Sequence, residues 1–200
     1  IGPQTLVNLR LGIDTGPVVA QNKVKIEKEF PEALDYLKVE KSNCETIISE
    51  FINIVKTNAD IPGIKQENDK SLYFPRLFTE INGVLNWDWD IESIERFIRA
   101  FSLPYPGAHT YYRDKKIHLV KCSIDKSCQT LFHPFSNGKI VTIMDDKTVR
   151  VIAGRRALII NEMSVDGELV PPGDFLSIKY TLFSPQDELV NAKQHVPTTL

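Results

Sequence analysis

The sequence predicts an α/β fold for its first part, followed by a linker helix and a small antiparallel β-barrel. Three observations support this assignment. Residues 1–60 contain short strand-type and longer helix-type segments, residues 91–102 have the apolar spacing of one amphipathic helix, and residues 108–200 carry short β-type segments separated by turns. The helix therefore joins two regions of different character.

The elements expected before this helix are two strands and two helices, over residues 5–9, 18–26, 31–37 and 42–55. Ser42 and Glu45 have the spacing of a capping box at the start of the second helix. Apolar residues then recur at helical spacing, at Ile47, Ile48, Phe51, Ile52 and Val55. Such a stripe is typical of a core face, so we assign it no chemistry.

The linker helix should begin at Ile91, because the Asp90 carboxylate can accept hydrogen bonds from free amides of the first turn. Pro104 lacks the amide that would continue the helix, so the helix should end at residue 102 or 103. Gly107 can adopt positive φ in a tight turn into the next strand. Trp87 and Trp89 have strand spacing, and we expect them to pack against the helix.

Five β-type segments follow the turn, over residues 110–112, 117–122, 139–144, 148–152 and 157–162. Hairpin-type connections separate several of them, and Arg155-Arg156 is expected at a charged hairpin tip. This spacing predicts a small antiparallel barrel or curled sheet, as in an open oligonucleotide-binding-type (OB-like) barrel.

Composition indicates a globular protein, since 42% of its 200 residues are hydrophobic. No apolar run approaches the roughly 20 residues that span a bilayer, so no membrane partner is expected. The three cysteines lack metal-type spacing, which predicts reduced thiols, a cytoplasmic location and no metal site. The net charge is −2, and residues 101–200 carry 12 Lys and Arg against 10 Asp and Glu. This balance weighs against a nucleic-acid partner without excluding a local basic patch.

A longer pattern runs from Leu72 to Cys122. In order, it contains Pro75-Arg76, Asn82-Gly83, Leu85-Asn86-Trp87, Phe97-Ile98-Arg99-Ala100-Phe101 and Pro104-Tyr105-Pro106-Gly107-Ala108. This stretch resembles the linker and C-terminal domain of the formyltetrahydrofolate-dependent formyltransferases. The resemblance implies that residues 1–60 are the C-terminal part of a formyltransferase Rossmann-like catalytic domain, 61–82 a linker, and 83–200 the formyltransferase C-terminal domain.

The loop Gly12-Ile13-Asp14-Thr15-Gly16 is similar to the family's loop that carries a catalytic aspartate. By this match Asp14 is the catalytic residue, and Gly12, Ile13, Asp14, Thr15 and Gly16 lie against the formyl donor, N10-formyltetrahydrofolate. In the family the aspartate pairs with a histidine that moves the proton, while an asparagine stabilises the oxyanion. That chemistry needs a neutral amine and a positioned donor for the tetrahedral intermediate.

The family's Asn-x-His motif lies upstream of the aspartate loop, and residues 1–13 do not contain it. The histidines of this chain all follow the linker helix and match no catalytic position, at His109, His118, His133 and His195. We therefore expect the chain to be the downstream part of a longer protein and not to catalyse formyl transfer alone.

The sequence leaves three functions open. The first is formyl transfer to a nucleotide-linked amino sugar, favoured by the Pro-Tyr-Pro-Gly-Ala turn and the nearly neutral barrel, with a homodimer implied by the resemblance. The second is a methionyl-tRNA formyltransferase, in which tRNA is the partner; a basic stripe between Lys139, Arg150, Arg155 and Arg156 would favour it. The third is a non-catalytic dimerisation or binding module.

Overall fold

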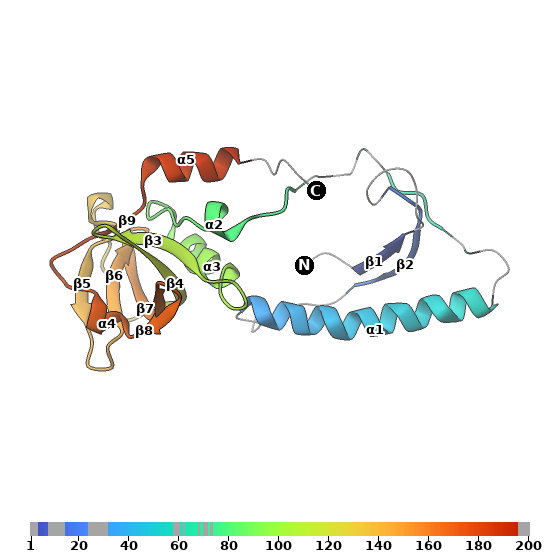
Figure 1. Ribbon diagram of the computed structural model, residues 1–200, viewed down its shortest axis with the longest axis horizontal. Coiled ribbons are helices and arrows are strands. Elements are labelled where there is room, and N and C mark those ends of the chain that lie inside the picture. The colour runs from blue at the N-terminus through green and yellow to red at the C-terminus, as the bar shows by residue number, and fades with distance from the viewer. Residues whose placement is uncertain are drawn as a thin grey trace. The chain divides into compact units, whose positions relative to one another are not determined.

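In the computed structural model the chain divides into two units, residues 1–74 and 75–200 (Figure 1). The structure describes residues 4–7, 15–23, 32–57, 61, 63–67, 69, 72 and 74–195. Each unit has its own secondary structure.

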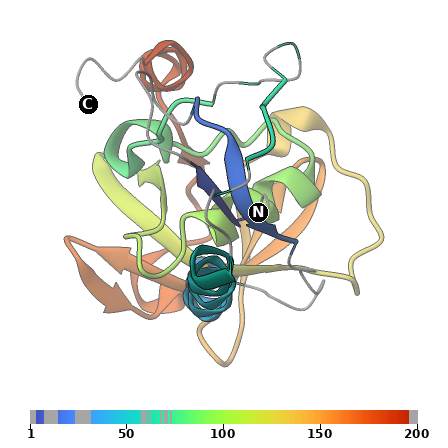
Figure 2. The ribbon, with the colours of Figure 1, turned by 90° about the vertical axis from the view of Figure 1, so that its right-hand side faces the viewer.

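The first unit contains an antiparallel strand pair and one long helix. Strand β1 (Gln4–Val7) pairs with β2 (Val18–Asn22), with a register shift between Leu6 and Val7. Helix α1 (Ala33–Thr57) packs along both strands, as the end-on view of α1 in Figure 2 shows. The outer ends of the two expected strands, residues 8–9 and 24–26, lie outside the described residues. The Rossmann-like assignment of this region stays a prediction.

Helix α1 is continuous where the sequence analysis predicted two helices. Residues 38–41, Lys-Val-Glu-Lys, contain neither Gly nor Pro, and most of them are good helix formers, so nothing interrupts the helix. Ser42 therefore lies in the helix interior, where its carbonyl accepts a hydrogen bond from Thr46 Oγ1 at 3.5 Å. The Ser42–Glu45 pattern does not start a helix, and that prediction was wrong.

Only part of the apolar stripe of α1 is core. Ile47 is buried, and on the same side Asn43 Oδ1 accepts a hydrogen bond from Asn22 Nδ2 in β2 at 2.6 Å. The next residues around the helix are 45–51% exposed, at Ile48, Ile52 and Val55. A helix on a two-stranded pair buries a narrow stripe, and each residue lies about 100° around the axis from its neighbour. The expectation of one fully buried face was therefore wrong for these three residues.

The second unit is built on a seven-stranded sheet with the order β5-β6-β7-β4-β3-β9, and β8 pairs with β7. The strands are β3 (Ala108–Tyr112), β4 (Lys115–Ile124), β5 (Ile140–Ile143), β6 (Val149–Ala153), β7 (Arg156–Val165), β8 (Glu168–Val170) and β9 (Leu182–Phe183). The helices are α2 (Thr79–Asn82), α3 (Ile91–Ala100), η2 (Pro134–Ser136), α4 (Pro172–Phe175) and α5 (Gln186–Gln194). All strand pairings are antiparallel, as predicted. Strands β8 and β9 and helices α2, η2, α4 and α5 were not predicted.

The sheet curls until its two edges meet. The Leu182 amide donates to the carbonyl of Gly138 at 2.8 Å, and the Ile140 amide donates to the carbonyl of Tyr180 at 3.3 Å. Gly138 has φ +81°, and a Cβ there would lie 2.0 Å from the Leu182 carbonyl oxygen, so this approach requires glycine. Residues 180–182 thus link β9 to the start of β5, which confirms a curled antiparallel sheet.

Helix α3 covers β4 and β7. It begins at Ile91 as predicted and ends at Ala100, before the predicted end at residue 102 or 103. Asp90 Oδ1 accepts a hydrogen bond from the Ser93 amide at 2.8 Å, which is the expected N-cap. Ile91, Ile94 and Ile98 are at most 1% exposed and form the centre of the core with the inner residues of the sheet. The turn at Gly107, with φ +107°, then leads into β3.

Trp87 and Trp89 lie in a turn rather than in a strand, so that part of the prediction was wrong. The Trp89 ring packs against Phe97 of α3 with centroids 5.0 Å apart, as expected. Trp87 is buried, and its Nε1 donates to Thr110 Oγ1 at 2.9 Å. Both tryptophans therefore fasten the segment before α3 to the rest of the second unit.

Candidate functional site

The predicted catalytic loop is described only at its downstream end. Gly12, Ile13 and Asp14 lie outside the described residues. Thr15 is exposed and Gly16 is buried, and β2 begins at Val18. The catalytic role of Asp14 stays a prediction.

Residues 64–66, which are distant in the sequence, form hydrogen bonds with the downstream end of this loop. Gln66 Nε2 donates to the Gly16 carbonyl at 2.7 Å. Val18 and Ile64 exchange two backbone hydrogen bonds, of 2.8 and 2.9 Å. The sequence predicts a linker over residues 61–82, and nothing in its local pattern signals this contact across 50 residues of chain. Residues 64–66 thus act as an anchor for the end of the aspartate loop.

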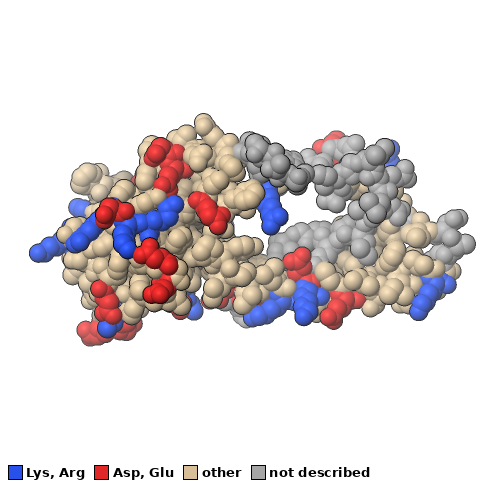
Figure 3. Space-filling model, viewed as in Figure 1, with Lys and Arg blue, Asp and Glu red and all other residues tan. Residues whose placement is uncertain are grey.

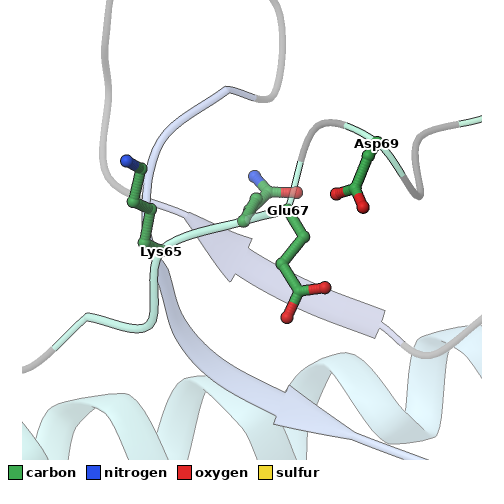
Figure 4. Close-up of a pocket in the computed structure, with 4 residues that line it drawn as sticks. Lys65, Glu67 and Asp69 are labelled. Atoms are coloured by element: carbon green, nitrogen blue, oxygen red, sulfur yellow. The ribbon is translucent and has the colours of Figure 1, made fainter.

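A cavity of about 440 Å³ lies beside this anchor, lined by Lys65, Gln66, Glu67 and Asp69 (Figure 4). All four side chains are exposed. In Figure 4 the Lys65 ammonium and the Glu67 carboxylate point away from one another. These groups can therefore bind polar atoms singly, but they do not converge on one reacting atom.

His109 of the second unit is buried and belongs to a polar cluster with Tyr111 and Glu188, both of which are part-buried. His109 Nε2 lies 3.4 Å from Glu188 Oε2 in α5, and the Tyr111 hydroxyl donates to Glu188 Oε1. Burial, followed by the Lys116 charge, lowers the pKa of His109 to about 4, although Glu188 opposes the shift. Burial and then the hydrogen bond to Glu188 raise the pKa of Tyr111 to about 12. At neutral pH both groups are uncharged, and the cluster fastens α5 to β3.

The other three histidines have contacts of a structural kind. His118 is half-buried, which lowers its pKa, and its ring lies 6.0 Å from that of His109. His133 Nδ1 accepts from the Phe135 amide at 3.2 Å and caps η2. The His195 ring packs edge-on against Phe78 at 5.7 Å. None of these contacts suggests a replacement for the family's catalytic histidine.

The four basic residues proposed as a stripe do not share one environment. Arg150 Nε lies 2.7 Å from Asp125 Oδ2, and Arg156 Nη1 lies 2.9 Å from Glu92 Oε1. Lys139 and Arg155 have no carboxylate partner in the part of the chain that the structure describes. On the face of the second unit drawn in Figure 3, basic and acidic side chains are interspersed. A continuous basic stripe through all four residues is therefore not formed.

Residues 78–179 match the model of the family described as formyl transferase, C-terminal domain. This match covers just over half of the chain. The chain belongs to the formyl transferase C-terminal domain family. The resemblance inferred from the ordered motifs between Leu72 and Cys122 is thereby confirmed.

Curated relatives extend the similarity beyond this domain. The chain is 30% identical to the methionyl-tRNA formyltransferase of Dictyoglomus thermophilum over 122 residues, which are 61% of this chain and 38% of that protein. It is 28% identical to the methionyl-tRNA formyltransferase of Carboxydothermus hydrogenoformans over 163 residues, 82% of this chain and 50% of that protein. Residues 78–200 number only 123, so the second alignment includes part of the first unit. The chain spans about half the length of these relatives, or less.

Solved structures show the same fold. HypX from Aquifex aeolicus superposes with a TM-score of 0.61 at 18% identity, over 86% of this chain and 30% of HypX. The structure of that HypX in complex with tetrahydrofolic acid gives a TM-score of 0.57 at 19% identity, over 86% of this chain and 29% of HypX.

No group of three or more His, Cys, Asp or Glu side chains in the described ranges could hold a metal ion. No helix in the described part of the chain is long and apolar enough to cross a membrane.

Proposed function

We propose that this chain is the C-terminal part of an enzyme that transfers a formyl group from N10-formyltetrahydrofolate to a primary amine. The observation that carries this proposal is the family match of residues 78–179 together with alignments that extend into the first unit. The HypX structure that holds tetrahydrofolic acid supports a folate as formyl donor. The boundaries 1–60, 61–82 and 83–200 are the domain assignment that accompanies this proposal.

Methionyl-tRNA is the first candidate for the amine. The relatives reported above are methionyl-tRNA formyltransferases, and they favour this substrate over the nucleotide-linked amino sugar that sequence analysis ranked first. The amino sugar remains the second candidate because of one observation. Arg150 and Arg156 are neutralised by Asp125 and Glu92, which removes two positive charges from the surface that would meet a tRNA backbone.

In the proposed reaction the amine nitrogen attacks the formyl carbon and forms a tetrahedral oxyanion. The bond from that carbon to N10 then breaks, and a proton passes from the amine to N10, which leaves the formylated amine and tetrahydrofolate. In this reaction Asp14 is assigned two tasks. It orients a histidine of the upstream segment, and it stabilises the positive charge of that histidine while the histidine moves the proton. The anchor formed by Gln66 and Ile64 at Gly16 and Val18 supports this role, because it limits motion at the end of the loop.

The test uses protein made from the complete reading frame that encodes these residues. Tetrahydrofolate release from N10-formyltetrahydrofolate is followed with methionyl-tRNA, with a nucleotide-linked amino sugar, and with no amine. We expect release with one of the two amines and a loss of about 100-fold or more in kcat for Asp14→Asn. Asp114→Asn, in the exposed β3–β4 turn, is the matched control and should retain full activity.

Two results would count against the proposal. Full activity of Asp14→Asn contradicts the catalytic assignment of Asp14. No release with either amine contradicts the enzyme assignment and favours a non-catalytic dimerisation or binding module, in which case the oligomeric state becomes the measurement to make.

A further inference from the structure

A second cavity, of about 280 Å³, lies on the second unit between the segment before α3, the helix η2 and the junction of β9 with α5. Its lining combines aromatic rings with amides and a carboxylate, notably Asn86, Asp88, Phe135, Asn137, Phe183 and Gln186. This combination of flat apolar surface and fixed hydrogen-bonding groups suits a ligand that is itself flat and polar at its edge.

The aromatic side of the cavity is open to solvent. Phe135 is 83% exposed and Phe183 is 44% exposed, so neither ring is needed to fill the core. The Lys139 ammonium lies 5.4 Å from the centroid of the Phe135 ring. An exposed ring beside a cation is a surface on which a nucleic-acid base can stack while its phosphate meets the positive charge.

The polar side of the cavity is held in place by its own hydrogen bonds. Asp88 Oδ1 accepts from Asn137 Nδ2 at 3.0 Å, and Asn86 Oδ1 accepts from the Asp88 amide at 2.9 Å. Three polar groups of the lining have no hydrogen-bond partner within the part of the chain that the structure describes. They are Asn86 Nδ2, Asp88 Oδ2 and the side-chain amide of Gln186. They offer donors and acceptors of the kind that bind the edge of a base.

The two basic residues of the expected stripe that have no carboxylate partner among the described residues do not line the cavity themselves, but each contacts a residue that does. The Lys139 ammonium contacts the ring of Phe135, which lines the cavity. The Arg155 amide donates to Asn137 Oδ1 at 3.1 Å, and Arg155 Nε donates to the Phe132 carbonyl at 3.3 Å. Since neither cation has a carboxylate partner among the described residues, both are available for a phosphate.

We propose that this cavity binds a single nucleotide, with the base against Phe135 and Phe183 and the phosphate at Lys139 and Arg155. The volume of about 280 Å³ lies just below the range of about 300 to 1,000 Å³ for ligand sites, so the cavity admits one nucleotide at most. The proposal rests on the proposed function, because both candidate substrates contain a nucleotide: an unpaired nucleotide of tRNA, or the nucleotide of an amino sugar.

The test measures binding of four probes to the complete protein: a fluorescently labelled single-stranded oligoribonucleotide and labelled tRNA by anisotropy, and UMP and AMP by calorimetry. Phe135→Ala should weaken nucleotide binding about tenfold, the usual effect of removing one stacking ring. Lys139→Gln should weaken binding and lower the slope of log K against log salt by about 0.7, as expected for one lost phosphate contact. Leu169→Ala and Lys126→Gln, at exposed positions that do not line the cavity, are the matched controls.

The two sources of the nucleotide give different results. Binding of the oligoribonucleotide and tRNA without binding of free UMP or AMP assigns the site to tRNA. Saturable binding of a free nucleotide, with no tighter binding of tRNA, assigns it to a nucleotide-linked substrate. No binding of any probe, or equal binding by the cavity variants and their controls, overturns the proposal.

Tetrahydrofolate release measured on the same samples separates this inference from the proposed function. Formyl transfer without an effect of the cavity variants on nucleotide binding overturns only the cavity. Nucleotide binding that depends on Phe135 and Lys139, without formyl transfer to any amine, overturns only the proposed enzyme activity.

Discussion

The buried His109 makes the stability of the second unit depend on pH. Its imidazole is 2% exposed and faces Glu188 from α5, Lys116 and His118 from β4, and Tyr111 from its own strand β3. The pKa falls from the ordinary value of 6.5 to about 4, first because of burial and then because of Lys116. We expect acidification from pH 7.5 to 5.0 to destabilise the folded state through this side chain.

The sign and size follow from proton linkage. Above pH 6.5 the imidazole is neutral in both states, so its contribution is fully present. As the pH falls from 6.5 toward 4, the unfolded chain takes up a proton that the folded chain does not, and stability is lost. At pH 5.0 a pKa of about 4 in the folded state against 6.5 in the unfolded state corresponds to a loss of about 2 kcal/mol.

Urea unfolding of the whole chain, followed by tryptophan fluorescence, measures this loss, because Trp87 and Trp89 both lie in the second unit. His109→Gln keeps a hydrogen-bond donor for Glu188 but cannot titrate. Between pH 7.5 and 5.0 the free energy of unfolding of this variant should therefore fall by about 2 kcal/mol less than that of the native chain. Equal pH dependence of His109→Gln and the native chain would refute the reasoning.

Two further predictions concern the core and the first unit. Gly154→Ala should destabilise the chain by about 1 to 3 kcal/mol more than Gly167→Ala. Both glycines have positive φ, but a Cβ at Gly154 would lie 2.4 Å from the Ile91 amide nitrogen, whereas a Cβ at Gly167 would face open space. Equal losses in urea unfolding would contradict this packing of Gly154 against the start of α3. Ile94→Ala, at a fully buried position, should cost about 3 kcal/mol, and Ile48→Ala, 51% exposed on α1, less than about 0.5 kcal/mol. A large thermal or urea shift for Ile48→Ala would show that the outer face of α1 is covered.

Local chemistry explains which elements could be predicted from sequence. The N-cap at Asp90, the apolar spacing from Ile91 to Ile98 and the turn at Gly107 each depend on a few neighbouring residues, and α3 and β3 form as expected. The hairpin strands of the sheet follow the same rule. Strand β9 has two residues and forms by pairing with Tyr111 and Tyr112 of β3, which are distant in the sequence, so no local pattern could reveal it.

The candidate sites likewise divide into features that a local pattern reveals and contacts that only the fold creates. The aspartate loop at residues 12–16 was found through its likeness to a family motif, because two glycines around an aspartate otherwise resemble an ordinary turn. The anchor of Gly16 by Gln66 joins residues 50 apart, and Asn137 meets Asp88 across 49 positions. Contacts at such separations arise from the fold, so the residues around them could not be assigned from sequence alone.

The segment after residue 179 completes the second unit, although the family match ends there. Leu182 is 1% exposed, Phe183 offers its carbonyl to Thr110 Oγ1 at 2.8 Å, and Ser184 Oγ donates to the Leu85 carbonyl at 2.5 Å. Asn82 Nδ2 of α2 then donates to the Ala192 carbonyl of α5 at 2.9 Å, which joins the end of the unit to its beginning.

The same segment supplies part of the proposed nucleotide site, since Phe183 and Gln186 line the cavity while Phe135 and Asn137 come from the matched region. Substitutions in residues 180–195 therefore affect stability and the cavity together, whereas Phe135 and Lys139 are exposed and can be changed without loss of buried contacts. This difference is why the binding variants belong at Phe135 and Lys139.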